Sequence, residues 1–266
     1  MSSHSEWRGS RARHDRGTLN SMASGSLSER MAWTGRRLQE THDDPRATFQ
    51  TAVEVTHSSI EECDAVGMSF VSRKHTVTTV AATDELAVVA DQLQYDLREG
   101  PRLDAVWEKH IVRSRDLSAD PRWPTWGPRV SEQTSARSVV SYQLFTNADH
   151  LGALNLYSKE VDAFDDTTME EGYAIAAHIS IAVSSALEID ALAQGLASRT
   201  VIGQATGILM ERYDLDSSRA FSVLARLSSQ GNIKIRTLAE QIVDNRHDGV
   251  GLPPSIDHRP LSRGTG

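Results

Sequence analysis

A chain of 266 residues, 39% of them hydrophobic, has room for two modest domains with real cores but leaves part of the sequence polar. The net charge of −8 argues against a nonspecific nucleic-acid coat, and the longest apolar stretches, such as Ala174 to Val183, are too short and too interrupted to span a bilayer. The single cysteine, Cys63, excludes an internal disulfide, so we expect a cytoplasmic protein without a membrane segment.

Both ends of the chain have the composition of disordered segments. Residues 1–43 are rich in Ser, Arg and Gly and have few spaced apolar residues, and residues 247–266 are rich in Gly and Pro. We therefore predict a disordered leader and a disordered tail around two folded domains, residues 44–190 and residues 191–246.

Charge separates the two folded parts. Residues 44–196 hold 12 Lys/Arg against 24 Asp/Glu, whereas residues 197–246 hold 7 against 5. The acidity therefore belongs to the middle domain, and the C-terminal segment is weakly basic.

Short β-rich runs alternate with helical stretches in the middle domain. The runs typical of strands are Ala65–Val71, Thr76–Ala82, Ile111–Arg115, Ser138–Phe145 and Leu151–Ser158. The stretches typical of helices are 47–57, 86–97 with Asp84 as its cap and Gly100-Pro101 as its end, and 103–109. Polar residues at 72–75 and 147–149 predict two hairpins. The pattern predicts an α+β domain, an antiparallel sheet flanked by helices.

From Asp166 the apolar period becomes helical. The segment as far as Leu192 is apolar over too much of its circumference for a helix that only covers a sheet. The surplus suggests a second partner, most simply the same helix of another subunit, so we expect a homodimer. Gly195 is expected to interrupt the helix, as a hinge or a weak spot.

Three helices are predicted for the C-terminal domain, over 196–212, 217–229 and 234–244. Asp216 is suited to capping the second helix and Asn232 to capping the third, while Gly231 separates them. The apolar residues expected to form the core are Val201, Ile202, Ile208, Leu209, Ala220, Phe221, Leu224, Leu227, Ile235, Leu238, Ile242 and Val243.

The residues Ala197-Ser198-Arg199-Thr200-Val201-Ile202-Gly203-Gln204-Ala205-Thr206-Gly207-Ile208-Leu209-Met210, followed by Ala220-Phe221, Leu224, Leu227-Ser228, Asn232, Lys234 and Ala239, resemble the ANTAR family along its full length. The resemblance implies an all-α three-helix domain that binds paired RNA hairpins in leader transcripts and prevents a terminator from forming. Relatives commonly have Lys where this chain has Thr206.

The middle region resembles a GAF domain of the subtype that precedes ANTAR modules. The residues that carry this likeness are Glu99-Gly100-Pro101, Leu103-Asp104-Ala105, Gly152-Ala153-Leu154-Asn155-Leu156-Tyr157-Ser158 and Ala163-Phe164. In many relatives a Cys follows the Glu-Gly-Pro turn, whereas this chain has Arg102. The likeness implies a sensory domain that modulates the RNA-binding output in response to a small-molecule or protein signal.

An RNA hairpin offers phosphates, 2′-hydroxyls and unstacked loop bases, so its reader needs cations, amides and hydroxyls on one surface. From charge alone an ordinary solvated face is the better interpretation of these polar residues, and the ANTAR resemblance reverses that preference. The predicted RNA-binding residues are Arg199, Gln204, Thr206, Gly207, Arg212, Arg226, Ser228, Asn232, Lys234 and Arg236. Gly203 and Gly207, four residues apart, could let helices or an RNA backbone approach closely.

Catalysis is not expected, because the sequence has no nucleophile elbow, phosphate-binding Gly loop or metal-binding helix pair, and no cofactor is expected either. Cys63 lacks nearby cations, which favours an inert thiol over a redox sensor. His57, His75, His110, His150 and His178 have no metal-site spacing. Trp107, Trp123 and Trp126, with three nearby prolines, predict an aromatic lid or packing corner.

Two other functions remain open at this point. The chain could be a ligand- or haem-binding sensor whose C-terminal helices act only as a protein-interaction or dimerisation module. The last two helices are also similar in size to a helix-turn-helix, which would bind duplex DNA.

Overall fold

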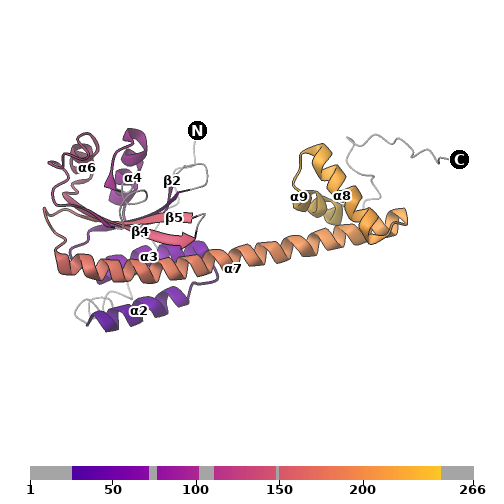
Figure 1. The fold of residues 1–266 in the computed structure, drawn as a ribbon, viewed down its shortest axis with the longest axis horizontal. Coiled ribbons are helices and arrows are strands. Elements are labelled where there is room, and N and C mark those ends of the chain that lie inside the picture. The colour runs from indigo at the N-terminus through magenta and orange to yellow at the C-terminus, as the bar shows by residue number, and fades with distance from the viewer. Residues whose placement is uncertain (1–25, 72–76, 102–110, 148–149, 247–266) are drawn as a thin grey trace. The chain divides into compact units, whose positions relative to one another are not determined.

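The computed structural model describes residues 26–71, 77–101, 111–147 and 150–246 (Figure 1). The chain divides into two compact units between Asp190 and Ala191, and each unit is described by itself. Several expectations lie outside the described residues: the disorder of 1–25 and 247–266, the helix over 103–109, and the turns at 72–75 and 148–149.

A five-stranded antiparallel sheet is the centre of the first unit, as the sequence predicts. Its strands lie in the order β2-β1-β5-β4-β3. Their bounds are β1 Ala65–Val71, β2 Val77–Ala82, β3 Ile111–Ser114, β4 Ser138–Asn147 and β5 His150–Ser158. The central strand β5 pairs with β1 and β4 on its two sides, so each of these three strands presents alternate residues to two opposite cores.

Helices α2 (Leu27–Gln39), α3 (Pro45–Ser59) and the first part of α7 (Asp166–Tyr213) lie on one face of this sheet (Figure 1). Met68, Tyr142 and Leu154 point from the sheet into this layer, where Phe49 of α3 and Ile179 of α7 are buried against them. Asp44 begins α3 by accepting hydrogen bonds from two backbone amides of its first turn, with Pro45 at the first helical position.

Helix α2 corrects the expectation of a disordered leader over residues 1–43. Ser26 and Glu29 form a reciprocal capping box at its start. Leu38 is buried in the core, and Arg30 forms an ion pair with Glu171 of α7. The helix is stable because of these contacts with residues far along the chain, which composition alone does not reveal.

The opposite face of the sheet is covered by α4 (Glu85–Leu97) and α6 (Trp126–Thr134). Asp84 caps α4, as predicted. Trp123 and Trp126 are buried edge to face with ring centroids 5.5 Å apart, and Trp126 Nε1 donates to the carbonyl of Ala90 at 3.0 Å. These two tryptophans are a packing corner rather than a lid; Trp107 lies outside the described residues.

The Glu99-Gly100 turn supports α6. Glu99 Oε2 accepts hydrogen bonds from the backbone amides of Thr125 and Trp126, each at 2.9 Å, where α6 has no side-chain cap of its own. These bonds hold the pKa of the Glu99 carboxyl below its usual value. Gly100 has φ +137°, and a Cβ there would collide with the side chain of Gln94, so the turn requires glycine.

A buried carboxylate lies between α4 and the sheet. Asp91 accepts hydrogen bonds from Thr79 (2.7 Å), Asn155 (3.1 Å) and Tyr157 (3.3 Å), and Ser141 donates to Asn155 at 2.6 Å. Every one of these groups has a partner within the network, so this polar cluster ties strands β2, β4 and β5 to α4.

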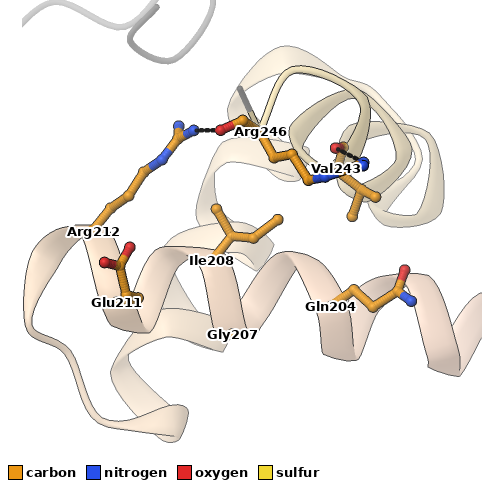
Figure 2. A pocket seen from close by; sticks show the side chains of 7 residues that line it. All are labelled: Gln204, Gly207, Ile208, Glu211, Arg212, Val243 and Arg246. Atoms are coloured by element: carbon orange, nitrogen blue, oxygen red, sulfur yellow. Dashed lines mark hydrogen bonds between the residues drawn. The ribbon is translucent and has the colours of Figure 1, made fainter. Parts of the chain in front are cut away.

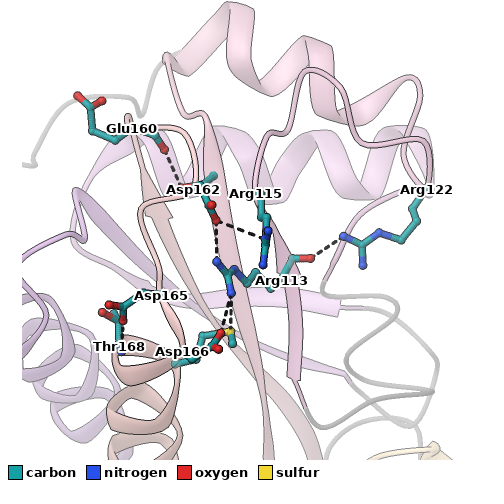
Figure 3. Close-up of polar contacts among 10 residues, drawn as sticks. Arg113, Arg115, Arg122, Glu160, Asp162, Asp165, Asp166 and Thr168 are labelled. Carbon is teal, nitrogen blue, oxygen red and sulfur yellow. Dashed lines mark hydrogen bonds and ion pairs between the residues drawn. The ribbon is translucent and has the colours of Figure 1, made fainter.

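An arginine fastens the start of α7 to strand β3 (Figure 3). Arg113 donates to Asp162 at 2.6 Å and to Asp166, in the first turn of α7, at 3.2 Å. Its side chain is only 15% exposed. Arg122, next to it, donates to the Arg113 carbonyl and forms an ion pair with Asp120.

Helix α7 is the one helix in the described part of the chain that is long and apolar enough to cross a membrane by length and composition. In the first unit, however, Ile175, Ile179 and Val183 on this helix are buried against the sheet. Part of the apolar surface of α7 is therefore buried in the core of the first unit.

The second unit is a three-helix arrangement formed by the end of α7, α8 (Ser217–Gly231) and α9 (Ile235–Asp244). Asp216 caps α8, as predicted. Asn232 is not the cap of α9: it ends α8 in the left-handed conformation at φ 49°, and Lys234 precedes α9. The buried core residues of the unit are Ala205, Leu209, Ala220, Leu224, Leu227, Leu238, Ala239 and Ile242.

Gly195 does not interrupt α7, which continues as one helix over 48 residues. A single glycine in a helix costs only about 1 kcal/mol relative to alanine, and the residues around Gly195 are good helix formers. The predicted break is therefore wrong.

Candidate nucleic-acid interface

A hollow of about 600 Å³ lies between α7 and α8 in the second unit. We call it the α7–α8 hollow; it is lined by Arg199, Ile202, Gly203, Thr206, Gly207 and Met210 of α7 and by Ser217, Ser218 and Phe221 of α8. Arg199 is the one charged residue of this lining, and no carboxylate belongs to it. Its electrostatic character therefore suits an anionic ligand.

A second hollow, of about 720 Å³, lies between α7 and α9 and is drawn in Figure 2. Gln204, Ile208, Glu211 and Arg212 of α7 face Val243 of α9 and Arg246, which follows α9, across it, and Gly207 lies on α7 between Gln204 and Ile208. The Arg212 guanidinium donates to the Arg246 carbonyl at 2.8 Å (Figure 2). With a carboxylate in its lining and one of its two arginines holding the end of α9, this hollow attracts an anion less than the α7–α8 hollow does.

Three of the predicted RNA-binding residues are exposed cations without an ion-pair partner among the described residues. Arg199 lies on α7, Arg226 on α8, and Lys234 in the turn before α9. Arg236 is different, because its Nε donates to Glu240 at 2.8 Å. Cations that are already solvated and unpaired can meet phosphates without first breaking an internal bond.

Other predicted residues have roles inside the unit itself. Thr206 is 7% exposed, and its hydroxyl donates to the Ile202 carbonyl at 2.7 Å. Ser228 donates to the Ile233 carbonyl at 2.6 Å, beside Asn232 in its left-handed conformation. Gln204 and Gly207 are exposed on α7. Five of the ten predicted residues thus line the two hollows, and the other five lie on α8, on α9 or in the turn between them.

Phe221 is the residue that sequence reasoning misplaced. It was expected in the core, yet 47% of it is exposed at the edge of the α7–α8 hollow. The buried stripe of α8 is Ala220, Leu224 and Leu227, and Phe221 lies one residue off that stripe. The spacing of the stripe could have revealed this position.

The cysteine and the histidines of the first unit that the structure describes show no sign of a redox or metal site. Cys63 is buried, its thiol donates to the Ala65 carbonyl at 3.2 Å, and burial raises its pKa far above the usual value. His57 and His178 are exposed and bond to backbone carbonyls. His75 and His110 lie outside the described residues.

The chain is similar to several solved structures. The chain is similar to the Stigmatella aurantiaca phytochrome photosensory core module, with 9% identity, a TM-score of 0.51 and coverage of 76% of this chain and 44% of that chain. It is also similar to a GAF domain of a Coxiella burnetii phosphoenolpyruvate-protein phosphotransferase, with 13% identity, a TM-score of 0.46, and coverage of 64% and 99%.

Free methionine-R-sulfoxide reductase from Neisseria meningitidis, solved in complex with its substrate, is similar with 15% identity, a TM-score of 0.49, and coverage of 62% of this chain and 95% of that chain. Identities this low bear on the fold alone. No curated protein sequence matches the chain.

Two family profiles match the sequence itself. The GAF domain profile matches residues 42–184, more than half of the chain, and the ANTAR domain profile matches residues 190–243. The first range contains the complete five-stranded sheet, and the second contains the three-helix core. Both families are regulatory and sensory, and the chain belongs to the GAF domain family with an ANTAR domain following its sensory unit.

Proposed function

We propose that this protein is a cytoplasmic RNA-binding transcription antitermination regulator, a homodimer whose two ANTAR domains bind two hairpins of one leader transcript. The GAF domain modulates this output in response to a small-molecule or protein signal, and the chain acts without catalysis. Residues 44–190 and 191–246 are its two functional domains, in keeping with the family matches.

The observation that carries the proposal is the electrostatic character of the second unit. Arg199, Arg226 and Lys234 are exposed and unpaired within the described part of that unit, although the protein as a whole has a net charge of −8. Arg199 also lines the α7–α8 hollow, whose lining has no carboxylate. An anionic polymer is the ligand that uses several separate cations at once.

An exposed apolar stripe on α7 supports the homodimer. Ile189, Leu192 and Leu196 are 37%, 68% and 68% exposed, and their spacings of three, four and seven residues place them on one face of the helix. Ile181, 69% exposed, precedes them. A second copy of α7 covers such a stripe with the same residues, as a two-fold interface requires.

The RNA-binding part is tested with the full-length protein and RNAs that carry one or two short hairpins, at a stated salt concentration. We expect the two-hairpin RNA to bind more tightly, because the second contact is intramolecular. The double substitution Arg199→Ala/Lys234→Ala is expected to weaken binding of both RNAs. It should also make the plot of the logarithm of the binding constant against the logarithm of the salt concentration less steep, by about one unit of slope per lost phosphate contact.

Arg115→Ala/Arg129→Ala is the matched control, since both arginines are exposed in the first unit and their removal takes away the same two charges elsewhere. Equal weakening by this control, or the absence of RNA binding by the unsubstituted protein, would overturn the proposal. Tighter binding of duplex DNA than of hairpin RNA would favour a helix-turn-helix function instead.

The dimer is tested by sedimentation or light scattering of Leu192→Glu/Leu196→Glu. This variant is expected to be monomeric and to lose the preference for two hairpins while keeping its affinity for one. Val161→Glu, which changes an equally apolar residue that is 47% exposed in the first unit, is expected to remain dimeric. A dimeric Leu192→Glu/Leu196→Glu protein would contradict this part of the proposal.

A further inference from the structure

The α7–α8 hollow combines three features that the RNA-binding proposal does not by itself require. These are a half-exposed aromatic ring at Phe221, a stretch of α7 without side chains at Gly203 and Gly207, and the unpaired cation Arg199. The hydroxyl residues Ser217 and Ser218 complete the edge on α8.

The exposed ring is not used by the core of the unit. The core of α8 is formed by Ala220, Leu224 and Leu227, while Phe221 is 47% exposed and lines the same hollow as Arg199. An aromatic face next to a cation is the arrangement on which proteins stack nucleobases while holding the neighbouring phosphate.

Gly203 and Gly207 leave the backbone of α7 accessible from the hollow. A Cβ added at Gly203 or at Gly207 would meet nothing within 4 Å, so the packing of the unit does not require glycine at either position. Glycine is unfavourable inside a helix relative to alanine. Its presence twice, one helical turn apart, leaves bare backbone that a flat group can approach closely.

A second copy of this chain fits the hollow less well than an anionic ligand does. In a two-fold contact in which the two α7 helices run parallel, residues on the contact face meet their own counterparts, and Arg199 would approach the Arg199 of the other copy. The apolar stripe that supports the dimer ends at Leu196, before this arginine. Charge therefore favours a nucleic acid in the hollow and the second copy on the stripe.

A volume of about 600 Å³ lies within the roughly 300–1,000 Å³ of pockets that take small molecules, so it suits one nucleoside-sized group and not a duplex. Bases inside a helix are stacked on their neighbours and cannot enter such a space, whereas the bases of a hairpin loop are free to do so.

We propose that the α7–α8 hollow takes one unpaired loop base of the RNA, stacked on Phe221, with its sugar and phosphate against Gly203 and Gly207 and with Arg199 holding the adjacent phosphate. This inference rests on the proposed RNA-binding function and names the part of the hairpin that the site reads. Ser217 and Ser218 lie where they can hydrogen-bond with the edge of the base.

The test pairs substitutions at Phe221 with removal of single loop bases from a one-hairpin RNA. In the unsubstituted protein, an abasic nucleotide at one loop position is expected to weaken binding by about tenfold or more. Phe221→Leu is expected to weaken binding of the intact hairpin by a similar factor and to make the abasic RNA bind no worse than the intact one. Phe221→Trp is expected to retain affinity, because its ring also stacks.

Tyr213→Leu is the matched control, since Tyr213 is equally exposed at 47% but does not line this hollow. Circular dichroism shows whether each variant is folded, and light scattering shows whether it remains dimeric.

The outcomes separate the two proposals. If no hairpin binds the unsubstituted protein, the RNA-binding function fails. If hairpins bind but both Phe221 variants bind them as the unsubstituted protein does, only the base-stacking inference is overturned. A monomeric Phe221→Leu protein would also overturn it, because the ring would then belong to the contact between copies.

Discussion

Replacing Gly203 and Gly207 with alanine is expected to stabilise the second unit and to weaken RNA binding at the same time. Each glycine lies in the interior of α7, and the added Cβ would meet nothing within 4 Å. Each substitution therefore brings the helix-propensity gain of about 1 kcal/mol without a steric cost. For a unit of this size, 1 kcal/mol raises the melting temperature by about 4–8 °C.

The same two substitutions should weaken RNA binding although they raise stability. The two methyl groups would cover the bare backbone of the α7–α8 hollow, so the sugar and phosphate would lose close contacts with α7. We expect the double variant to bind a hairpin about tenfold more weakly, a loss of about 1.4 kcal/mol.

All five tryptophans precede residue 127, so helical circular dichroism that changes without a tryptophan fluorescence change reports the melting of the second unit. Gly195→Ala is the matched control: it lies in the same helix, also meets nothing within 4 Å, and lines neither hollow. It should melt later without losing affinity. A double variant that is more stable and binds hairpins normally would refute the role of the bare backbone.

Three further outcomes concern the first unit. Cys63 should remain unmodified by a thiol-specific reagent until the protein unfolds, because burial raises its pKa; rapid modification of the native protein would contradict this. Arg113→Ala should lower the free energy of unfolding by about 1–2 kcal/mol in a denaturant titration, whereas Arg115→Ala, at a 70% exposed position, should change it little. Since the pKa of Glu99 is lowered by folding, its contribution to stability is present above the unfolded value of about 4.5 and is lost as the pH falls through the folded value. The melting temperature of Glu99→Gln should therefore depend less on pH in that acid range, and an unchanged acid dependence would exclude this role.

Local signals in the sequence were sufficient for the sheet and for the helix caps. Short β-rich runs place all five strands within two residues of their observed ends, and Asp84 and Asp216 begin the helices that they are expected to cap. Strand periodicity and N-cap hydrogen bonds act over a few residues, so they can be read without knowledge of the fold.

The misjudged features depend on contacts between distant residues. Helix α2 lies in a polar segment whose one local signal is the Ser26-Glu29 capping box, and it is stable because Leu38 is buried in the core and Arg30 meets Glu171. The candidate site shows the same limit: its cations could be identified by type, but not that Ser228 bonds to the turn before α9. Phe221 is different, because the spacing of the buried stripe of α8 already places it off the core. Whether a side chain is used internally is decided by tertiary packing.

The continuity of α7 through Gly195 changes how the dimer and the RNA site relate to each other. In an unbroken helix, Leu192, Leu196, Arg199 and Gly203 lie on one face, since their spacings are three and four residues. If the two α7 helices of the proposed dimer run parallel, a second copy seated on the two leucines brings the two Arg199 side chains toward each other, which is unfavourable until an anion lies between them. In such a dimer an RNA phosphate at Arg199 would remove that repulsion. We therefore expect RNA binding to strengthen the proposed dimer and, by thermodynamic linkage, the dimer to strengthen RNA binding to the same degree. A break at Gly195 would have separated the leucines from the arginine, and this reciprocal effect would have no structural basis.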